Sequence, residues 1–562
     1  MNRNWLIEKM FERRGYTTEY VKEIEQFDHK MLKDADVLCQ KLYDIYLQKK
    51  HVVFIPDFDV DGIACGIVGY AGLAELGFHV SLYIPDPSQG YGFNAKTIMQ
   101  LVAQYPTVEV ILTGDVGISC YEGIDMAKQC GIEVLITDHH KQEQLSSADC
   151  VVNPMRLDET YEHPQICGAY VLYQCLQLYA DTYCNRFVQE QIRRLRVFAG
   201  IGTISDTMPL LYENRQLVRD SITISRLIYA SGDDFIVNHI IGNDVYRRAF
   251  RGLYLTFCMF ADMGKITSND DINEDFFGYY LAPMFNSVKR MGADMTRSFG
   301  VFFGPNPEED VNYLYQLNNE RKLLVSHYFE ELQSTDQPYA PYIYLSDAPS
   351  GILGLLAQKL IVTSGVPTIV VRQDDNHFHG SGRSPMWYPF LDRTVFICHA
   401  AGHNPAFGVG FTDKKELKAF HAFLAKDVQD VLSVTELPET TFQPDFVIAH
   451  DGTGDTVIDI LLFAEYLQEL SRYHPFGQGF AAPCILLKFK PEDGEWSVMG
   501  GTKQHLKIRL AHGFEVLLWN QSNQINRKDM NRECFVVGQL GMSEYLGNHT
   551  INFIGDFMEV DD

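Results

Sequence analysis

The sequence predicts an α/β protein with a parallel-sheet domain, a helical connector, a second α/β domain and a C-terminal β-barrel. Short apolar runs at 51–57, 79–85, 109–115 and 132–138 alternate with helix-like segments. Runs of this length that are separated by helices are typical of a parallel sheet. A second alternation of the same kind begins near residue 340, and a strand-rich tail begins near residue 440.

The remaining elements follow in chain order. Residues 1–50 are predicted to be helical, and 165–335 is mainly helical with a long amphipathic helix over 310–333. The sequence "STDQP" then interrupts the pattern, which places a boundary near residue 335. We therefore predict four domains, at 1–225, 226–335, 336–434 and 435–562.

Composition limits the class of protein. Of the 562 residues 46% are hydrophobic and 12% aromatic, as in an ordinary globular protein. No run reaches the roughly 18 apolar residues that would span a bilayer. The 12 cysteines contain no C-x-x-C pair, which favours free thiols in a reducing compartment. These features predict a cytoplasmic protein without a membrane segment.

The net charge of −26 argues weakly against a nucleic-acid partner, because phosphate binders are usually basic. An acidic protein can still carry a single basic groove. In "GTKQHLKIRL" the basic residues Lys503, Lys507 and Arg509 recur with period two between apolar residues. On a strand they form a basic stripe that suits the backbone of a single-stranded nucleic acid. The alternative is an ordinary solvated strand face.

Acidic residues follow three of the predicted strands. Asp57, Asp59 and Asp61 alternate directly after the first run, and Asp115 and Asp138 end two later runs. Like charges this close repel one another unless a cation lies between them. Because the carboxyl ends of parallel strands share one edge of the sheet, we expect these acids to converge.

Carboxylates together with histidine are ligands that suit Mn²⁺ or Mg²⁺. The acids outnumber what one ion needs, and two ions about 3.5–4 Å apart that share a carboxylate are used for phosphoester hydrolysis. Taken alone, "DFDVDG" could be half of a calcium loop and "DHH" a turn with a helix cap. Their joint occurrence at strand ends favours a metal centre. The candidates are Asp57, Asp59, Asp61, Asp115, Asp138, His139, His140 and Asp206.

The segments "DFDVDG", "TGDVGIS", "ITDHHK" and "GTISDTMPL", in this order, resemble the four motifs of the DHH phosphoesterase superfamily. "GSGRSP" and "AAGHNPAFGVGF" resemble the DHH-associated C-terminal domain. "HPFGQGFAAPCIL" resembles the start of the oligonucleotide-binding (OB) fold in RecJ-type exonucleases.

The resemblance implies a site with two Mn²⁺ or Mg²⁺ ions, in which Asp115 bridges and His140 contacts the scissile phosphate. The implied metal ligands are Asp57, Asp59, Asp61, Asp115, His139 and Asp206. The implied contacts to the nucleic-acid backbone are Arg290, Arg383, Ser384, Gly402 and His403.

The implied activity is a 5′→3′ exonuclease that degrades single-stranded DNA to 5′-mononucleotides in repair and recombination. The implied protein is a monomer, with a helicase or a single-strand-binding protein as candidate partner. One departure concerns the loop "IPDPSQGYG" (84–92), which lacks an arginine that the family uses to grip the 5′-phosphate. The resemblance therefore predicts altered recognition of the DNA end.

Two other functions remain open at this stage. A DHH phosphodiesterase for short oligonucleotides or cyclic dinucleotides would share every metal motif but usually ends before a region like 435–562. A relative that serves as a replication or scaffold protein would have lost motif acids, whereas all of them are present here.

Overall fold

The computed structural model describes residues 4–25, 31–86, 90, 92–375, 377–394, 398–434, 443–500, 504–519, 521, 533–545 and 548–560. It divides into two compact units. Unit 1 comprises 1–28, 209–219 and 441–562, and unit 2 comprises 29–208 and 220–440. Among the described helices, none is both long and apolar enough to cross a membrane.

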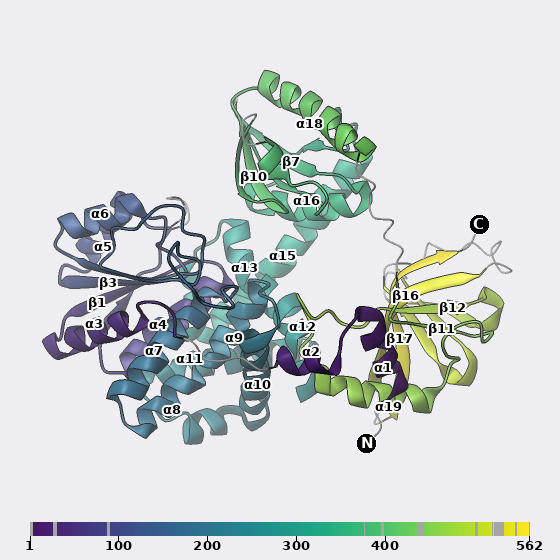
Figure 1. The fold of residues 1–562 in the computed structure, drawn as a ribbon, viewed down its shortest axis with the longest axis horizontal. Coiled ribbons are helices and arrows are strands. Elements are labelled where there is room, and N and C mark those ends of the chain that lie inside the picture. The colour runs from purple at the N-terminus through teal and green to yellow at the C-terminus, as the bar shows by residue number, and fades with distance from the viewer. Residues whose placement is uncertain are drawn as a thin grey trace. The chain divides into compact units, whose positions relative to one another are not determined.

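A five-stranded, fully parallel sheet with the order β2-β1-β3-β4-β5 positions the acidic motifs of unit 2. Helices α5 and α6 cover one face of this sheet, and α4 and α7 cover the other (Figure 1). The predicted parallel sheet is confirmed. Its elements are α3 (Ala35–Gln48), β1 (His51–Pro56), α4 (Val60–Glu75), β2 (His79–Leu82), α5 (Ala95–Gln104), β3 (Val108–Gly114), α6 (Tyr121–Gln129), β4 (Glu133–Thr137), β5 (Cys150–Val152) and α7 (Gly168–Tyr183).

A set of helices follows the sheet and ends in the long helix α15, Pro307–Ser334. The predicted amphipathic helix over 310–333 is present, and it begins three residues earlier, at Pro307, where the missing N–H of proline costs nothing. The other elements are α8 (Arg186–Arg194), α9 (Arg196–Ser205), α10 (Tyr212–His239), α11 (Asp244–Asp262), α12 (Glu274–Phe276), the π-turn Phe277–Leu281, α13 (Ala282–Met291) and α14 (Thr296–Phe303).

The second α/β region of unit 2 is a five-stranded sheet with the order β6-β7-β8-β10-β9. Only β6 and β7 pair in parallel, and the remaining pairs are antiparallel. Helix α16 packs on one face and α18 on the other (Figure 1). The elements are β6 (Ile343–Leu345), α16 (Ser350–Ser364), β7 (Thr368–Asp374), β8 (His377–Arg383), α17 (Phe390–Thr394), β9 (His399–His403), β10 (Ala406–Phe411) and α18 (Lys414–Val434).

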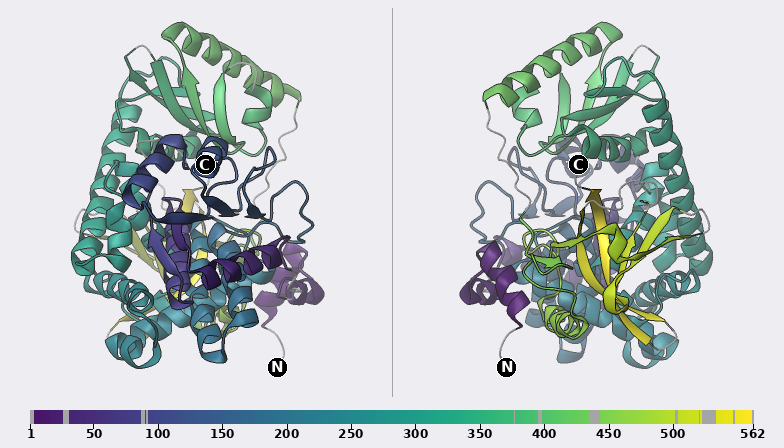
Figure 2. Two further views of the ribbon diagram at one scale, coloured as in Figure 1. Left: turned by 90° about the vertical axis from the view of Figure 1, so that its left-hand side faces the viewer. Right: turned by 90° about the vertical axis from the view of Figure 1, so that its right-hand side faces the viewer.

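Unit 1 is built on a seven-stranded sheet with the order β11-β12-β16-β17-β15-β14-β13, whose curved strands are seen in Figure 2. The strand-rich tail is therefore confirmed. Its elements are β11 (Phe446–Ala449), α19 (Ile460–Leu470), β12 (Ile485–Phe489), β13 (Glu495–Met499), β14 (His505–Arg509), β15 (Glu515–Leu518), β16 (Cys534–Tyr545) and β17 (Asn548–Val560).

The N-terminal helices α1 (Trp5–Arg14) and α2 (Thr18–Glu23) belong to this unit. Leu6, Met10 and Phe11 are buried in the same core as the strands of the tail. The predicted division at 1–225 therefore differs from the structure, because the apolar face of α1 packs on residues more than 400 positions later.

An ion pair fixes α1 to the start of β11. Arg14 donates from Nε and Nη2 to both carboxylate oxygens of Asp445, at 2.7 and 2.6 Å, and also to the carbonyls of Ala481 and Ala482. The Asp445 side chain is 6% exposed. Removal of one partner would leave the other charge buried and unpaired.

We therefore expect Arg14→Met to lower the free energy of unfolding of unit 1 by ~2–4 kcal/mol. Its neighbour Arg13 has a side chain that is 33% exposed, and Arg13→Met should cost less than about 1 kcal/mol. Urea unfolding of the two variants measures the difference. Equal losses would show that the Arg14–Asp445 pair does not hold the helix.

Candidate metal centre

The three aspartates of "DFDVD" lie where β1 meets helix α4. Asp57 follows the buried strand, Asp59 caps α4 by accepting a hydrogen bond from the N–H of Gly62 at 3.1 Å, and Asp61 lies in its first turn. Asp61 is buried and accepts hydrogen bonds from the N–H groups of Gly168 and Ala169, at 2.6 and 3.2 Å. One carboxylate thus joins the N-termini of α4 and α7.

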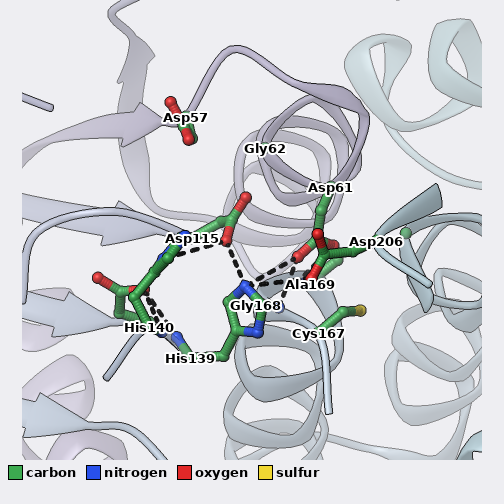
Figure 3. Close-up of polar contacts among 12 residues, drawn as sticks. Asp57, Asp61, Gly62, Asp115, His139, His140, Cys167, Gly168, Ala169 and Asp206 are labelled. Atoms are coloured by element: carbon green, nitrogen blue, oxygen red, sulfur yellow. Dashed lines mark hydrogen bonds and ion pairs between the residues drawn. The ribbon is translucent and has the colours of Figure 1, made fainter. Parts of the chain in front are cut away.

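Asp115 lies at the end of the adjacent strand β3, in the centre of the cluster (Figure 3). Its φ of +65° belongs to the left-handed region, which non-glycine residues rarely adopt and which is typical of functional sites. The side chain is buried, and its Oδ1 makes no hydrogen bond. A buried carboxylate oxygen without a donor is costly unless a cation binds it.

The two histidines follow the third strand, β4, and Asp138 orients them. Its carboxylate accepts hydrogen bonds from the N–H groups of Ile118, His139 and His140, at 2.9, 2.7 and 3.1 Å. It also lies 2.8 Å from Nδ1 of His140. Asp138 is therefore engaged by these donors rather than open to an ion.

His139 connects the two halves of the cluster. Its Nε2 lies 3.1 Å from Asp115 Oδ1, 3.6 Å from Asp206 Oδ2 and 3.9 Å from Asp61 Oδ2. Asp206 follows the last turn of α9, whereas the other acids of the cluster lie at or just after the ends of strands β1 and β3.

The ligand atoms fall into groups that fit divalent ions. Asp57, Asp59 and Asp115 form one group, and Asp61, His139 and Asp206 form another, with all ligand atoms of a group within 4.8 Å of one another. Asp115, His139 and His140 form a third group that overlaps both. Hard oxygen ligands with imidazole suit Mn²⁺ or Mg²⁺, and the central Asp115 is placed to serve both ions.

Burial and mutual repulsion raise the pKa of Asp57, Asp115 and Asp206 in the absence of metal. Burial, followed by the charge of Asp59, raises the pKa of Asp57 to about 7. Burial and the charge of Asp61 raise the pKa of Asp206 to about 8 and hold the pKa of Asp115 well above its ordinary range. These carboxylates would ionise fully only with cations among them.

The two histidines differ from each other. Burial lowers the pKa of His139, so its ring is neutral and able to act as a ligand. Burial also opposes a charge on His140, but the hydrogen bond with Asp138 outweighs it and raises the pKa of His140 to about 9. In the metal-free protein His140 is therefore a cation at neutral pH.

Glycines allow the elements to meet closely at the site. A Cβ at Gly202 of α9 would lie 2.3 Å from Asp61 Oδ1, and one at Gly168 would lie 2.6 Å from the Asp115 Cβ. A methyl group at either position would displace a carboxylate.

We expect Gly202→Ala to weaken Mn²⁺ binding by about tenfold or more, because Asp61 must move to make room. Gly278→Ala is the matched control, because its Cβ would meet nothing closer than 3.6 Å. Isothermal titration of both variants with Mn²⁺ measures the change. Wild-type affinity in Gly202→Ala would mean that Asp61 is not a ligand.

A cavity of about 310 Å³ opens beside the acids. Both acidic and basic side chains line it. Its lining residues are Asp59, Val60, Asp61, Ser205, Asp206, Asn286, Lys289, Arg290 and Gly351.

Arg290 lines this cavity and lies in the last turn of α13. Burial, followed by the charges of Arg321 and Arg383, lowers the pKa of Arg290 to about 10. Among the described residues none of these three arginines has a carboxylate in ion-pair contact, and Arg321 and Arg383 bond instead to the amide oxygens of Asn318 and Gln358. Arg321 could not be identified from the sequence, because its helix, α15, approaches the elements that carry Arg290 and Arg383 only in the folded chain.

The other predicted contacts to the nucleic-acid backbone lie in the second α/β region, and they differ in exposure and in their hydrogen bonds. Ser384 is buried and donates its hydroxyl to the Tyr388 carbonyl, so this hydroxyl is engaged within the domain. Gly402 is exposed in β9 with a φ of +125°. The side chain of His403 lies outside what the structure describes. The nucleic-acid contacts of these residues stay predictions.

The predicted basic stripe of the tail is partly neutralised. Lys507 and Arg509 lie on one face of β14, but both pair with Glu515 of β15, at 2.6 and 3.0 Å. Trp519 is half exposed and its ring lies 4.9 Å from that of His505, whereas Phe514 is fully buried. Lys503 lies outside the described residues.

Two segments of the chain match domains of known protein families. The N-terminal domain of the DHH family matches residues 51–200, and the RecJ OB domain matches residues 461–555. The chain therefore carries a DHH-family domain and a RecJ OB domain.

The relatives are distant but cover most of this RecJ-like chain. It is 24% identical to the single-stranded-DNA-specific exonuclease RecJ of Bacillus subtilis, over 96% of this chain and 66% of that protein. It is 23% identical to RecJ of Haemophilus influenzae, over 92% of this chain and 89% of that protein. The chain thus spans slightly less than two thirds of the Bacillus relative.

Solved structures support the same fold. RecJ from Thermus thermophilus in complex with Mn²⁺ matches with a TM-score of 0.72 and 20% identity, over 99% of this chain and 76% of that one. The same protein has been solved with Mg²⁺. The donor set of this RecJ-like chain fits either ion, since it combines hard carboxylates with a neutral imidazole.

Proposed function

We propose that this protein is a metal-dependent exonuclease that hydrolyses single-stranded DNA from the 5′ end. The observation that carries the proposal is the pair of ligand groups around Asp115 and His139, at the carboxyl edge of the sheet. The cavity beside these ligands is also lined by basic side chains. The relatives described as single-stranded-DNA-specific exonucleases support the same substrate.

Two divalent ions held by Asp57, Asp59, Asp61, Asp115, His139 and Asp206 would activate a water molecule and offset the charge that develops on the phosphate. The protein's own contribution is to hold these ligands fixed. Asp61 is tied to the N-terminus of α7, and Asp138 fixes the orientation of His140. Nε2 of His140 would donate a hydrogen bond to the phosphate.

Arg290 in the cavity wall, together with the nearby Arg321 and Arg383, would hold the DNA strand. Arg290, Arg321 and Arg383 come from α13, α15 and β8, and a phosphodiester backbone supplies the negative charge that these arginines lack within the protein. Phosphate contacts of this kind position a strand without reading its sequence. In unit 1, Trp519 and the outer face of β14 would offer a base-stacking surface and a modest positive charge.

A digestion of two single-stranded 40-mers, one labelled at each end, tests the proposal in the presence of Mn²⁺. Early release of the 5′ label as a mononucleotide is expected. Intact 40-mers together with cleavage of di- to pentanucleotides would instead establish the small-substrate phosphodiesterase. Substrates with a 5′-phosphate and a 5′-hydroxyl should differ little, because the loop 84–92 contains no lysine or arginine.

We also propose a role in DNA repair and recombination, a cytoplasmic location and a monomeric state, with a helicase or a single-strand-binding protein as partner. These follow from the family resemblance and from the names of the relatives.

A further inference from the structure

A second cation, Lys289, lies beside Arg290 in the wall of the metal-site cavity. It occupies the last turn of α13, which ends at Gly292 with a φ of +63°. The side chain is exposed, and among the described residues no carboxylate lies within ion-pair distance of it. An unpaired lysine next to a cluster of acids calls for a physical explanation.

Its position is fixed by an aromatic ring rather than by an acid. The Lys289 ammonium lies 4.3 Å from the centroid of the Phe58 ring, and Phe58 stands between the ligands Asp57 and Asp59. A cation over a phenylalanine ring keeps its donors free, because the ring face accepts no strong hydrogen bond.

Charge balance indicates what Lys289 binds. The five clustered aspartates exceed the charge of two divalent ions by one, and a bound phosphodiester adds one more negative charge. Arg290 and Lys289 are the two cations of the cavity wall, and together they balance this excess. With both ions bound, Arg290 alone balances the one negative charge that remains on the acids. Lys289 is then left to balance the charge of an incoming phosphate.

We propose that Lys289 contacts a non-bridging oxygen of a substrate phosphate in the metal-site cavity and so helps to set the affinity for the strand. The inference rests on the proposed function and deepens it. It assigns to α13 two adjacent phosphate contacts, Lys289 and Arg290, which line the same cavity as Asp59, Asp61 and Asp206. Since the loop 84–92 carries no basic residue, α13 would supply charge that this loop does not.

The test compares Lys289→Gln, Lys289→Arg and Lys359→Gln with the wild type. Lys359 is the matched control, since it is also exposed and lies over a phenylalanine ring, that of Phe329 at 5.0 Å, but outside the cavity. Fluorescence anisotropy with a labelled ten-residue oligothymidylate in Ca²⁺ gives Kd at several salt concentrations. Digestion of the same strand in Mn²⁺ gives kcat and KM.

We expect Lys289→Gln to raise Kd and KM about tenfold with a small change in kcat, and to flatten the slope of log Kd against log salt by about 0.7. Lys289→Arg should restore most of the affinity, and Lys359→Gln should behave as the wild type. An unchanged Kd and salt slope in Lys289→Gln, with active wild type, would overturn the assignment and leave the exonuclease intact. A wild type that neither binds nor cleaves the strand would overturn the proposed function itself.

Discussion

Asp115→Asn should lower kcat/KM on single-stranded DNA by about a thousandfold or more, which corresponds to ~4 kcal/mol of transition-state stabilisation. Asp115 is the carboxylate that lies in two of the ligand groups, as His139 also does, and its buried Oδ1 makes no hydrogen bond. An amide at this position keeps the shape of the side chain and tolerates the positive φ. It lacks the charge that two cations would share.

The same substitution should stabilise the metal-free protein. Burial and the charge of Asp61 raise the pKa of Asp115 well above its ordinary range, so its ionised form is unfavourable in the empty site. We expect the free energy of unfolding in EDTA to rise by ~1–3 kcal/mol, as measured by urea unfolding. Asp125→Asn, at an exposed position of α6, is the control and should change neither quantity. Loss of both activity and stability in Asp115→Asn would instead indicate a structural carboxylate.

Metal should stabilise the protein strongly at pH 8 and weakly at pH 5. The ordinary pKa of an aspartate is 3.8, whereas in the folded protein the pKa is about 7 for Asp57 and about 8 for Asp206. Between pH 3.8 and about 7 for Asp57, or about 8 for Asp206, the folded protein holds protons on these carboxylates that the unfolded chain has released. The free energy of unfolding of the metal-free protein therefore falls as the pH rises from 4 to 8.

Bound ions remove this penalty, because they replace the protons on the carboxylates. At saturating Mn²⁺ we expect the melting temperature to rise by about 5 °C or more at pH 8 and by clearly less at pH 5. Differential scanning calorimetry with Mn²⁺ and with EDTA measures both shifts. In Asp206→Asn the difference between the Mn²⁺-induced shifts of the melting temperature at pH 8 and at pH 5 should be smaller than in the wild type. An equal metal shift at both pH values would contradict the clustering of the acids.

The acidic centre could be predicted from sequence because its geometry follows from a parallel sheet. Asp57, Asp115 and Asp138 each end an apolar run, and the strand order β1-β3-β4 brings the three ends together. Sequence could not separate their roles. Asp138 has the same position relative to its strand as the others, and only its hydrogen bonds to His139 and His140 distinguish an orienting carboxylate from a ligand.

The basic side of the cavity was predicted only in part. The family resemblance named Arg290 and Arg383. It did not name Lys289 and Arg321, which lie on α13 and α15, and these helices meet through tertiary packing that leaves no spacing to detect in the sequence. The same limit applied to α1, whose amphipathic pattern predicts a buried face but not the partner that buries it. The stripe on β14 had the predicted period, but its pairing with Glu515 depends on strand register.

The central claim is that two ions bind around one shared carboxylate, and Mn²⁺ titration followed by electron paramagnetic resonance tests it most directly. We predict two Mn²⁺ per chain, with a spin-coupled signal at saturation because Asp115 joins the two ligand groups. In Asp115→Asn the coupling should disappear. A single, uncoupled Mn²⁺ in a wild-type protein that still degrades DNA would contradict the two-ion centre.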